Sequence, residues 1–190
     1  MLNKKDYTHF DLTRFELCDE ELELSIHTTH HFEPFDETDE TNENVKPLYM
    51  AQIKDGNRHG EMRYFHDNGE LKGRVFYCEG KLYGPSEFYA ESGQLVSKSW
   101  FYNGVQVGRS ERYYATGELY CKESWVREGK HGKQLYWYRN GQLKSDLDYK
   151  WGILDGCAKM YYSDGTLKRH CHYKEGQRAG KDEIFDKNGN

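Results

Sequence analysis

The chain of 190 residues is long enough for one or two domains and carries 27 basic against 32 acidic side chains, a formal net charge of −5 at pH 7. No apolar run approaches the roughly 18 residues needed to span a bilayer, and no basic-then-apolar leader begins the sequence. We therefore expect a protein that stays in the cytoplasm rather than a helical membrane protein or an exported one.

Charge is segregated along the chain. Residues 1–45 hold 3 basic and 13 acidic side chains, a net charge of −10, whereas the remaining residues hold 24 basic and 19 acidic ones, a net charge of +5. Apolar and acidic residues partly alternate over residues 10–26, which predicts one or two strands that cap the first edge of the following domain. Residues 33–44 contain very few apolar side chains, which predicts a flexible acidic linker. The domains expected are a cap and linker over residues 1–47 and a repeat array over residues 48–190.

A period of 24 residues dominates the chain from about residue 56 onward. Two glycine columns and three apolar columns keep this period in register. The glycines are Gly60, Gly84, Gly108, Gly132, Gly156 and Gly180, and Gly69, Gly93, Gly117, Gly141, Gly165 and Gly189. The apolar columns begin at Phe65, Leu71 and Tyr77 and continue with the same period.

Each unit is predicted to be a β-hairpin. The pair Asn68-Gly69 and its equivalents supply the positive φ angles of a tight hairpin turn, between one strand over residues 61–66 and a second over residues 71–77. The two-residue period of a strand would place Leu71, Gly73, Val75 and Tyr77 on one face. A strand over residues 48–53 enters the array, and the column of Phe65, Tyr89, Tyr113, Trp137 and Tyr161 is expected to form its core.

These units resemble the MORN repeat variant found in bacterial proteins, with its G-x-x-x-G, aromatic, N-G-x-L and terminal Tyr pattern. The resemblance covers residues 54–190, as five full units and a truncated sixth. It departs at Gly129, which comes one residue late, and at Arg112, which stands where other units have an apolar residue. The resemblance implies an all-β fold, an elongated antiparallel sheet of consecutive hairpins about 50 to 60 Å long with strands about 4.8 Å apart.

Motifs of catalysis or cofactor binding are not found. The repeated glycines punctuate hairpins instead of opening a helix, and there is no nucleophile elbow or H-E-x-x-H pair. His170 and His172 share one face of a strand, and Cys171 lies on the other face. Two ligands on one strand are only half of a metal site, so we expect no metal or cofactor. The five scattered cysteines never form a C-x-x-C pair and are expected to be reduced thiols. A single-layer sheet offers no deep pocket, so we do not expect an enzyme.

Side chains one position out of phase with the leucines are predicted to form a basic ridge with interleaved aromatics. The ridge could be a solvated face, a contact for nucleic acid or anionic lipid, or a protein-binding face. The acidic N-terminal segment would compete with phosphates for it, which favours a protein partner over direct nucleic-acid binding.

A chain that consists of MORN-variant repeats and little else is similar to the YwqK-type bacterial antitoxins, which resemble immunity proteins. This resemblance implies that the chain binds and neutralises a cognate toxin domain by protein contact. If that toxin is a nuclease or a deaminase, the acidic arm would mimic nucleic-acid phosphates at its active-site rim. The alternative is a scaffold or effector that binds a host protein or anionic membrane lipid. The candidate partner-binding residues are Asp19, Glu20, Glu21, Glu23, Asp36, Glu37, Lys72, Arg74, Lys98, Trp100, Tyr120 and Lys122.

Overall fold

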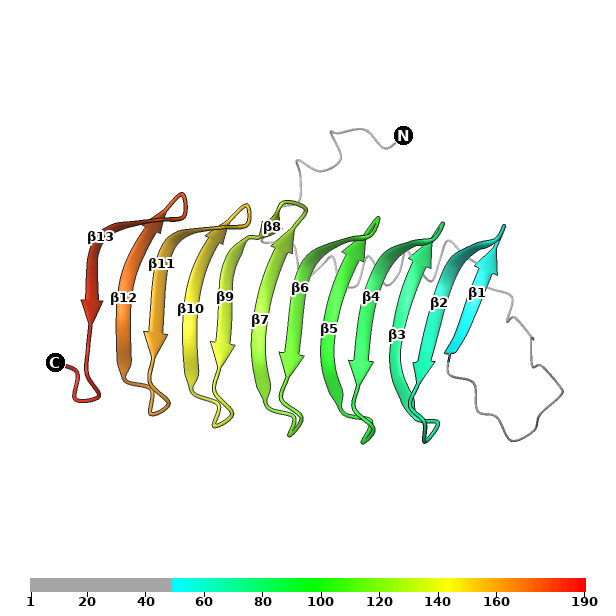
Figure 1. Ribbon diagram of the computed structural model, residues 1–190, viewed down its shortest axis with the longest axis horizontal. Coiled ribbons are helices and arrows are strands. Elements are labelled where there is room, and N and C mark those ends of the chain that lie inside the picture. Colours follow the sequence, from blue (N-terminus) through cyan, green and yellow to red (C-terminus); the bar gives the residue numbers. More distant parts are fainter. Residues whose placement is uncertain (1–48) are drawn as a thin grey trace. The chain divides into compact units, whose positions relative to one another are not determined.

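The computed structural model describes residues 49–190, and within this range every regular element is a β-strand (Figure 1). The acidic candidates Asp19, Glu20, Glu21, Glu23, Asp36 and Glu37, and the predicted cap, lie outside it. No helix among the described residues could cross a lipid bilayer. The strands are β1 (Tyr49–Lys54), β2 (Asn57–Phe65), β3 (Leu71–Cys78), β4 (Lys81–Tyr89), β5 (Leu95–Tyr102), β6 (Val105–Tyr113), β7 (Leu119–Val126), β8 (Gly129–Lys130), β9 (Gly132–Trp137), β10 (Leu143–Lys150), β11 (Ile153–Tyr161), β12 (Leu167–Lys174) and β13 (Gln177–Ile184).

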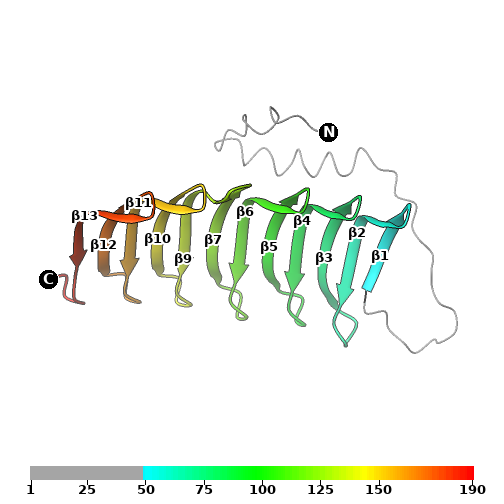
Figure 2. The same ribbon diagram turned by 45° about the horizontal axis from the view of Figure 1, so that its top comes forward.

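The strands form one open antiparallel sheet whose spatial order follows the chain order. Each long strand pairs with the long strands before and after it in the chain, except that the edge strands β1 and β13 each have one partner. The short β8 lies off this path, against β7. Figure 2 shows the strands side by side in a single row. The predicted all-β sheet of consecutive hairpins is confirmed.

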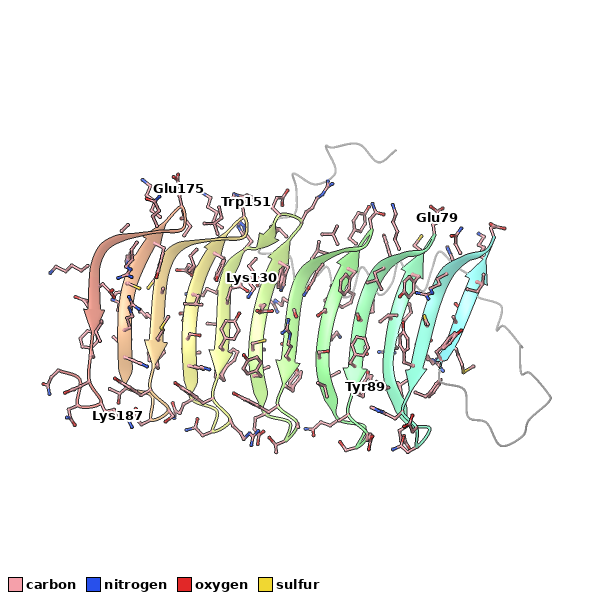
Figure 3. The ribbon with its side chains drawn as sticks, in the orientation of Figure 1. Glu79, Tyr89, Lys130, Trp151, Glu175 and Lys187 are labelled. Carbon is pink, nitrogen blue, oxygen red and sulfur yellow. The ribbon has the colours of Figure 1, made fainter. Side chains whose placement is uncertain are left out.

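Two kinds of turn alternate along the sheet. Along one side of the sheet, at the strand ends, the connection has two residues, and both have positive φ, as at Asp55 (50°) and Gly56 (74°), which are the angles of a type I′ turn. Figure 3 shows Glu79, Trp151 and Glu175, which each begin such a turn, along this side. The exception is the connection between β7 and β8, where neither Arg127 nor Glu128 has a positive φ. The predicted hairpin turn at Asn68-Gly69 is present, but the pair of positive φ angles expected there is found at Asp55-Gly56 and its equivalents instead.

The turn at Asn68-Gly69 is longer. The Gly69 N–H donates to the His66 carbonyl at 2.8 Å, the His66 N–H donates to the Glu70 carbonyl at 2.9 Å, and only Gly69 has a positive φ, 88°. The Asn68 side chain accepts a hydrogen bond from the Glu70 N–H at 2.9 Å, as an Asx turn does. Asparagine here caps the turn and does not supply a second left-handed residue.

A bulge follows each of the longer turns and changes which face a side chain occupies. Phe65 pairs with Leu71 but Tyr64 pairs with Gly73, so Lys72 is an extra residue on β3. The same position in later units is occupied by Val96, Tyr120, Lys144 and Lys168. Leu71 consequently shares a face with Phe65 rather than with Gly73 and Val75, and the predicted alternation fails at this residue.

The column that is buried in every unit from Met62 to Ala158 is not the one expected. Met62, Ser86, Ser110, Gln134 and Ala158 stand one repeat apart, and each is at most 6% exposed. The column predicted to be the core is only half-buried, because it lies next to the longer turns. Two tyrosines of this column form hydrogen bonds through their hydroxyls: Tyr89 donates to Glu87 and Tyr113 donates to Glu111, each at 2.7 Å.

Candidate binding faces

Strand pairing lines up one residue from each of twelve strands in a row across one face of the sheet. We call this the apolar row, because β2, β4, β9, β11 and β13, the first strands of their repeats, contribute aromatic or aliphatic side chains to it. The first strand of the remaining repeat, β6, is the exception. The row runs through Tyr49, Tyr64, Gly73, Phe88, Ser97, Arg112, Cys121, Tyr136, Ser145, Met160, Arg169 and Ile184.

Large and small residues mostly alternate along the apolar row. Gly73 has no side chain, so the Phe88 ring lies over it and stacks on Tyr64 with 6.4 Å between ring centroids. A Cβ atom at Gly73 would come within 2.6 Å of the Phe88 ring. Four large side chains of the row remain open to solvent: Tyr49 (60% exposed), Phe88 (38%), Met160 (37%) and Ile184 (69%). These four side chains lie on β1, β4, β11 and β13, and exposed large apolar side chains gathered on one face are typical of a protein contact.

The opposite face carries a second row, which we call the charge row. It runs through Met50, Arg63, Arg74, Glu87, Lys98, Glu111, Lys122, Leu135, Asp146, Lys159, His170 and Glu183. Five of these side chains are basic and four are acidic, and most charged neighbours have opposite sign.

Ion pairs bridge the strands along the charge row. Arg74 Nε lies 2.5 Å from Glu87 Oε2 and Lys98 Nζ lies 3.3 Å from Glu87 Oε1. Lys122 Nζ lies 3.1 Å from Glu111 Oε1. The expected basic ridge is therefore wrong, because glutamates from the first strands of the repeats lie on this face and neutralise Arg74, Lys98 and Lys122. Cross-strand pairs of opposite charge stabilise a sheet and leave little net potential for a polyanion.

Both glutamates stay ionised in these pairs. Burial disfavours the carboxylate of Glu87 and by itself raises its pKa, but hydrogen bonds from Arg74 and Tyr89 outweigh burial and lower the pKa below its ordinary value. The pKa of Glu111 is lowered in the same way, with burial opposed by hydrogen bonds from Tyr113 and Lys122. The Tyr113 hydroxyl is partly buried and donates to that carboxylate, which raises the pKa of Tyr113 to about 12.

The remaining ridge candidates are dispersed. Trp100 is only 4% exposed, with Lys98 Nζ 5.4 Å from its ring centroid, so it is not an exposed aromatic of this face. Tyr120 is a bulge residue whose ring packs edge-on against Tyr136 of the apolar row, 6.0 Å between centroids, and it therefore lies on the face opposite Lys122. Lys72 is an exposed bulge residue beside Gly73.

A buried ion pair interrupts the apolar face near its centre. Glu123, 4% exposed, accepts hydrogen bonds from Lys130 Nζ at 2.7 Å and from the Tyr136 hydroxyl at 2.6 Å. Lys130 also lies 5.5 to 5.7 Å from the ring centroids of Trp125, Tyr136 and Tyr149, within cation–π range (Figure 3). Burial raises the pKa of Glu123, but the hydrogen bonds from Lys130 and Tyr136 outweigh it and the net pKa is lowered.

A cluster of metal-ligating side chains occupies the charge-row face near the C-terminal end of the sheet. Cys157 pairs in register with His172, and its Sγ lies 3.3 Å from His170 Nε2. In the sequence the two histidines amount to only half a site. Cys157 lies on the preceding strand, and no sequence motif links it to them, because it becomes their neighbour only through the register of β11 and β12.

Three segments match the family described as MORN repeat variant: residues 58–79, 130–150 and 154–175. Over these segments the chain is similar to MORN-variant repeats, which supports the resemblance seen in its sequence. No curated protein matches the chain. One matching solved structure, titled "Crystal structure of GtfA/B complex bound to UDP and GlcNAc", has 16% sequence identity and a TM-score of 0.27. The match covers 65% of this chain but only 24% of that chain, and a likeness this low carries no argument about function.

Proposed function

We propose that this chain, whose MORN-variant repeats form an open binding sheet, is a non-catalytic immunity protein that binds and neutralises a cognate toxin domain. The observation that supports protein binding is the apolar row, which exposes the large apolar side chains of Tyr49, Phe88, Met160 and Ile184 on one face of the sheet. Repeat arrays of this kind use an extended surface to hold a partner.

The charge row argues against the alternative of anionic lipid or nucleic acid. Membrane and phosphate binding require basic side chains that are not already neutralised. Arg74 and Lys98 both pair with Glu87, and Lys122 pairs with Glu111. The face that the sequence predicted to be cationic is therefore nearly balanced.

The toxin assignment rests on the resemblance to immunity proteins, and it is tested by capture followed by neutralisation. The tagged full-length chain is used to capture proteins from the cells that make it, at low and at high salt. The captured protein is then expressed in a heterologous host with and without this chain. We expect a stoichiometric protein that survives high salt and whose toxicity the chain suppresses.

Matched variants assign the binding to the apolar row. Met160→Ser with Ile184→Ser removes two exposed apolar side chains of the row, and Ile153→Ser removes one of similar exposure, 50%, outside it. The row variant should lose the partner and the control should keep it. Two results would favour the membrane alternative. One is capture of lipid instead of protein. The other is binding to vesicles that contain anionic lipid, if the double variant Lys98→Ser with Lys122→Ser loses that binding.

A further inference from the structure

Three residues of β11 and β12 present metal-ligating atoms to a single point. The ligand atoms of Cys157, His170 and His172 all lie within 4.8 Å of one another. The two imidazole rings have centroids 5.1 Å apart at an interplanar angle of 67°. Because Cys157 and His172 are register partners and His170 is two residues before His172, all three side chains leave the same face of the sheet.

The spacing is close to that of ligands around one tetrahedral ion. With Zn–S and Zn–N bonds of about 2.3 and 2.0 Å, two such ligands would have their S and N atoms about 3.5 Å apart. The Cys157 Sγ to His170 Nε2 distance is 3.3 Å. The cluster needs only small side-chain adjustment to accept an ion.

A carboxylate orients one of the histidines for this role. Glu183 Oε2 lies 3.3 Å from His170 Nδ1, whereas Cys157 Sγ faces the other ring nitrogen. A carboxylate on one ring nitrogen fixes the tautomer that leaves the other nitrogen free to bind a metal. The Cys157 N–H in turn donates to Asp148 Oδ2 at 3.0 Å.

The cluster is specific to one repeat. None of the equivalent positions in the other units carries a cysteine or a histidine, so three separate departures from the repeat meet at one place. The equivalents of Cys157 are Glu61, Pro85, Arg109, Lys133 and Lys181; those of His170 are Arg74, Lys98, Lys122 and Asp146; those of His172 are Phe76, Trp100, Ser124 and Asp148.

We propose that Cys157, His170 and His172 bind a zinc ion. One thiolate and two imidazoles suit a borderline-soft divalent cation and do not suit Mg²⁺ or Ca²⁺, which prefer oxygen ligands. Three protein ligands leave a fourth position, which faces solvent beside the exposed His172 and is filled by water or by a side chain of a bound partner. The ion would also link β11 to β12.

Zinc binding to the purified full-length chain is measured by isothermal titration after removal of metal with a chelator. Cobalt serves as a spectroscopic probe. We expect one zinc per chain, a thiolate-to-cobalt charge-transfer band, and a rise in unfolding temperature with zinc concentration, because a ligand that binds the native state stabilises it. The variants His172→Gln and Cys157→Ser should lose this binding, and Glu183→Gln should weaken it by about 10- to 100-fold.

Cys78→Ser is the matched control, because Cys78 is a half-buried free thiol in a strand of the same sheet outside the cluster. It should keep both zinc and the cobalt charge-transfer band. Absence of stoichiometric zinc in a folded chain would overturn the proposal. So would binding that survives His172→Gln and Cys157→Ser, since the ion would then be held elsewhere.

Discussion

At the scale of single residues, Lys130 shows how one repeat accommodates a departure from the period. Lys130 pairs with Trp125 as Leu82 pairs with Tyr77 and Leu154 pairs with Tyr149, so it occupies a position where two other repeats have leucine. Its ammonium is satisfied by Glu123, which stands where other units have Val75 and Leu147. The two substitutions are compatible only together.

Removing one partner of this pair should destabilise the fold. Lys130→Leu leaves the carboxylate of Glu123 buried without its closest cation, and we expect the free energy of unfolding to fall by about 2 to 3 kcal/mol. This is less than for a fully buried pair, because the Lys130 side chain is 26% exposed. The double variant Glu123→Leu with Lys130→Leu should recover most of the loss. Urea denaturation measures the free energy of unfolding of the two variants. If both are destabilised equally, Lys130 and Glu123 are not energetically coupled.

Thiol reactivity should follow burial. Cys121 is fully buried, and burial beside Glu123 raises its pKa to about 11, so few thiolates form at neutral pH. Site-resolved mass spectrometry after brief alkylation of the native chain should find Cys121 unmodified and the half-buried Cys78 modified. Equal labelling of both in the folded chain would mean that the sheet opens at Cys121.

At the scale of elements, the hairpins were predictable from sequence because their signals are local. The 24-residue period and the glycine columns identify the repeating unit, and glycine marks both kinds of turn. The type of each turn was less accessible. Glu79 and Trp151 adopt φ angles of 49° and 52° although neither is a usual left-handed residue, because the following glycine and the register of the flanking strands impose the type I′ turn.

The faces were not predictable, because a bulge changes them. One extra residue, Lys72 or Tyr120, places the leucine before it, Leu71 or Leu119, on the other face from the rest of the strand. The predicted ridge therefore combined residues of two faces and lacked Glu87 and Glu111. Cys157 was missed for a related reason, since its contact with His170 depends on pairing between strands.

A substitution at the two-residue turn tests its conformation without changing a contact. Gly104 has a φ of 82°, and a Cβ there would meet no atom within 4 Å. Gly104→Ala should lower the free energy of unfolding by about 1 to 2 kcal/mol through backbone strain alone. Asn103→Gly, which keeps a residue tolerant of positive φ, should change it by much less. An unaffected stability in Gly104→Ala would contradict the type I′ assignment.

At the scale of the whole sheet, each strand contacts only its neighbours, so interactions that bridge strands set the stability of the array. The charge row is one such continuous element. Glu87 and Glu111 of this row, and Glu123 on the opposite face, all have lowered pKa values in the folded chain. Their contribution to stability is fully present above the pKa of the unfolded chain, about 4.3.

Acid should therefore destabilise the sheet. As the pH falls from about 5 through the lowered pKa values of the folded state, the unfolded chain binds more protons than the folded chain and the free energy of unfolding decreases. The variant Glu87→Gln should be less stable at pH 7 and should lose less stability on acidification. Thermal unfolding between pH 7 and pH 3 measures both effects, and parallel curves for the variant and the parent chain would contradict this account.

The central claim, that a partner protein is held on the apolar row, is tested most directly by hydroxyl-radical footprinting of the complex with the captured protein. Two methionines report on opposite faces: Met160 belongs to the apolar row and Met50 to the charge row, and they are 37% and 50% exposed. We predict that partner binding suppresses oxidation of Met160 and Phe88 and leaves Met50 as reactive as in the free chain. Protection of Met50 with undiminished oxidation of Met160 would place the partner on the other face and contradict the account.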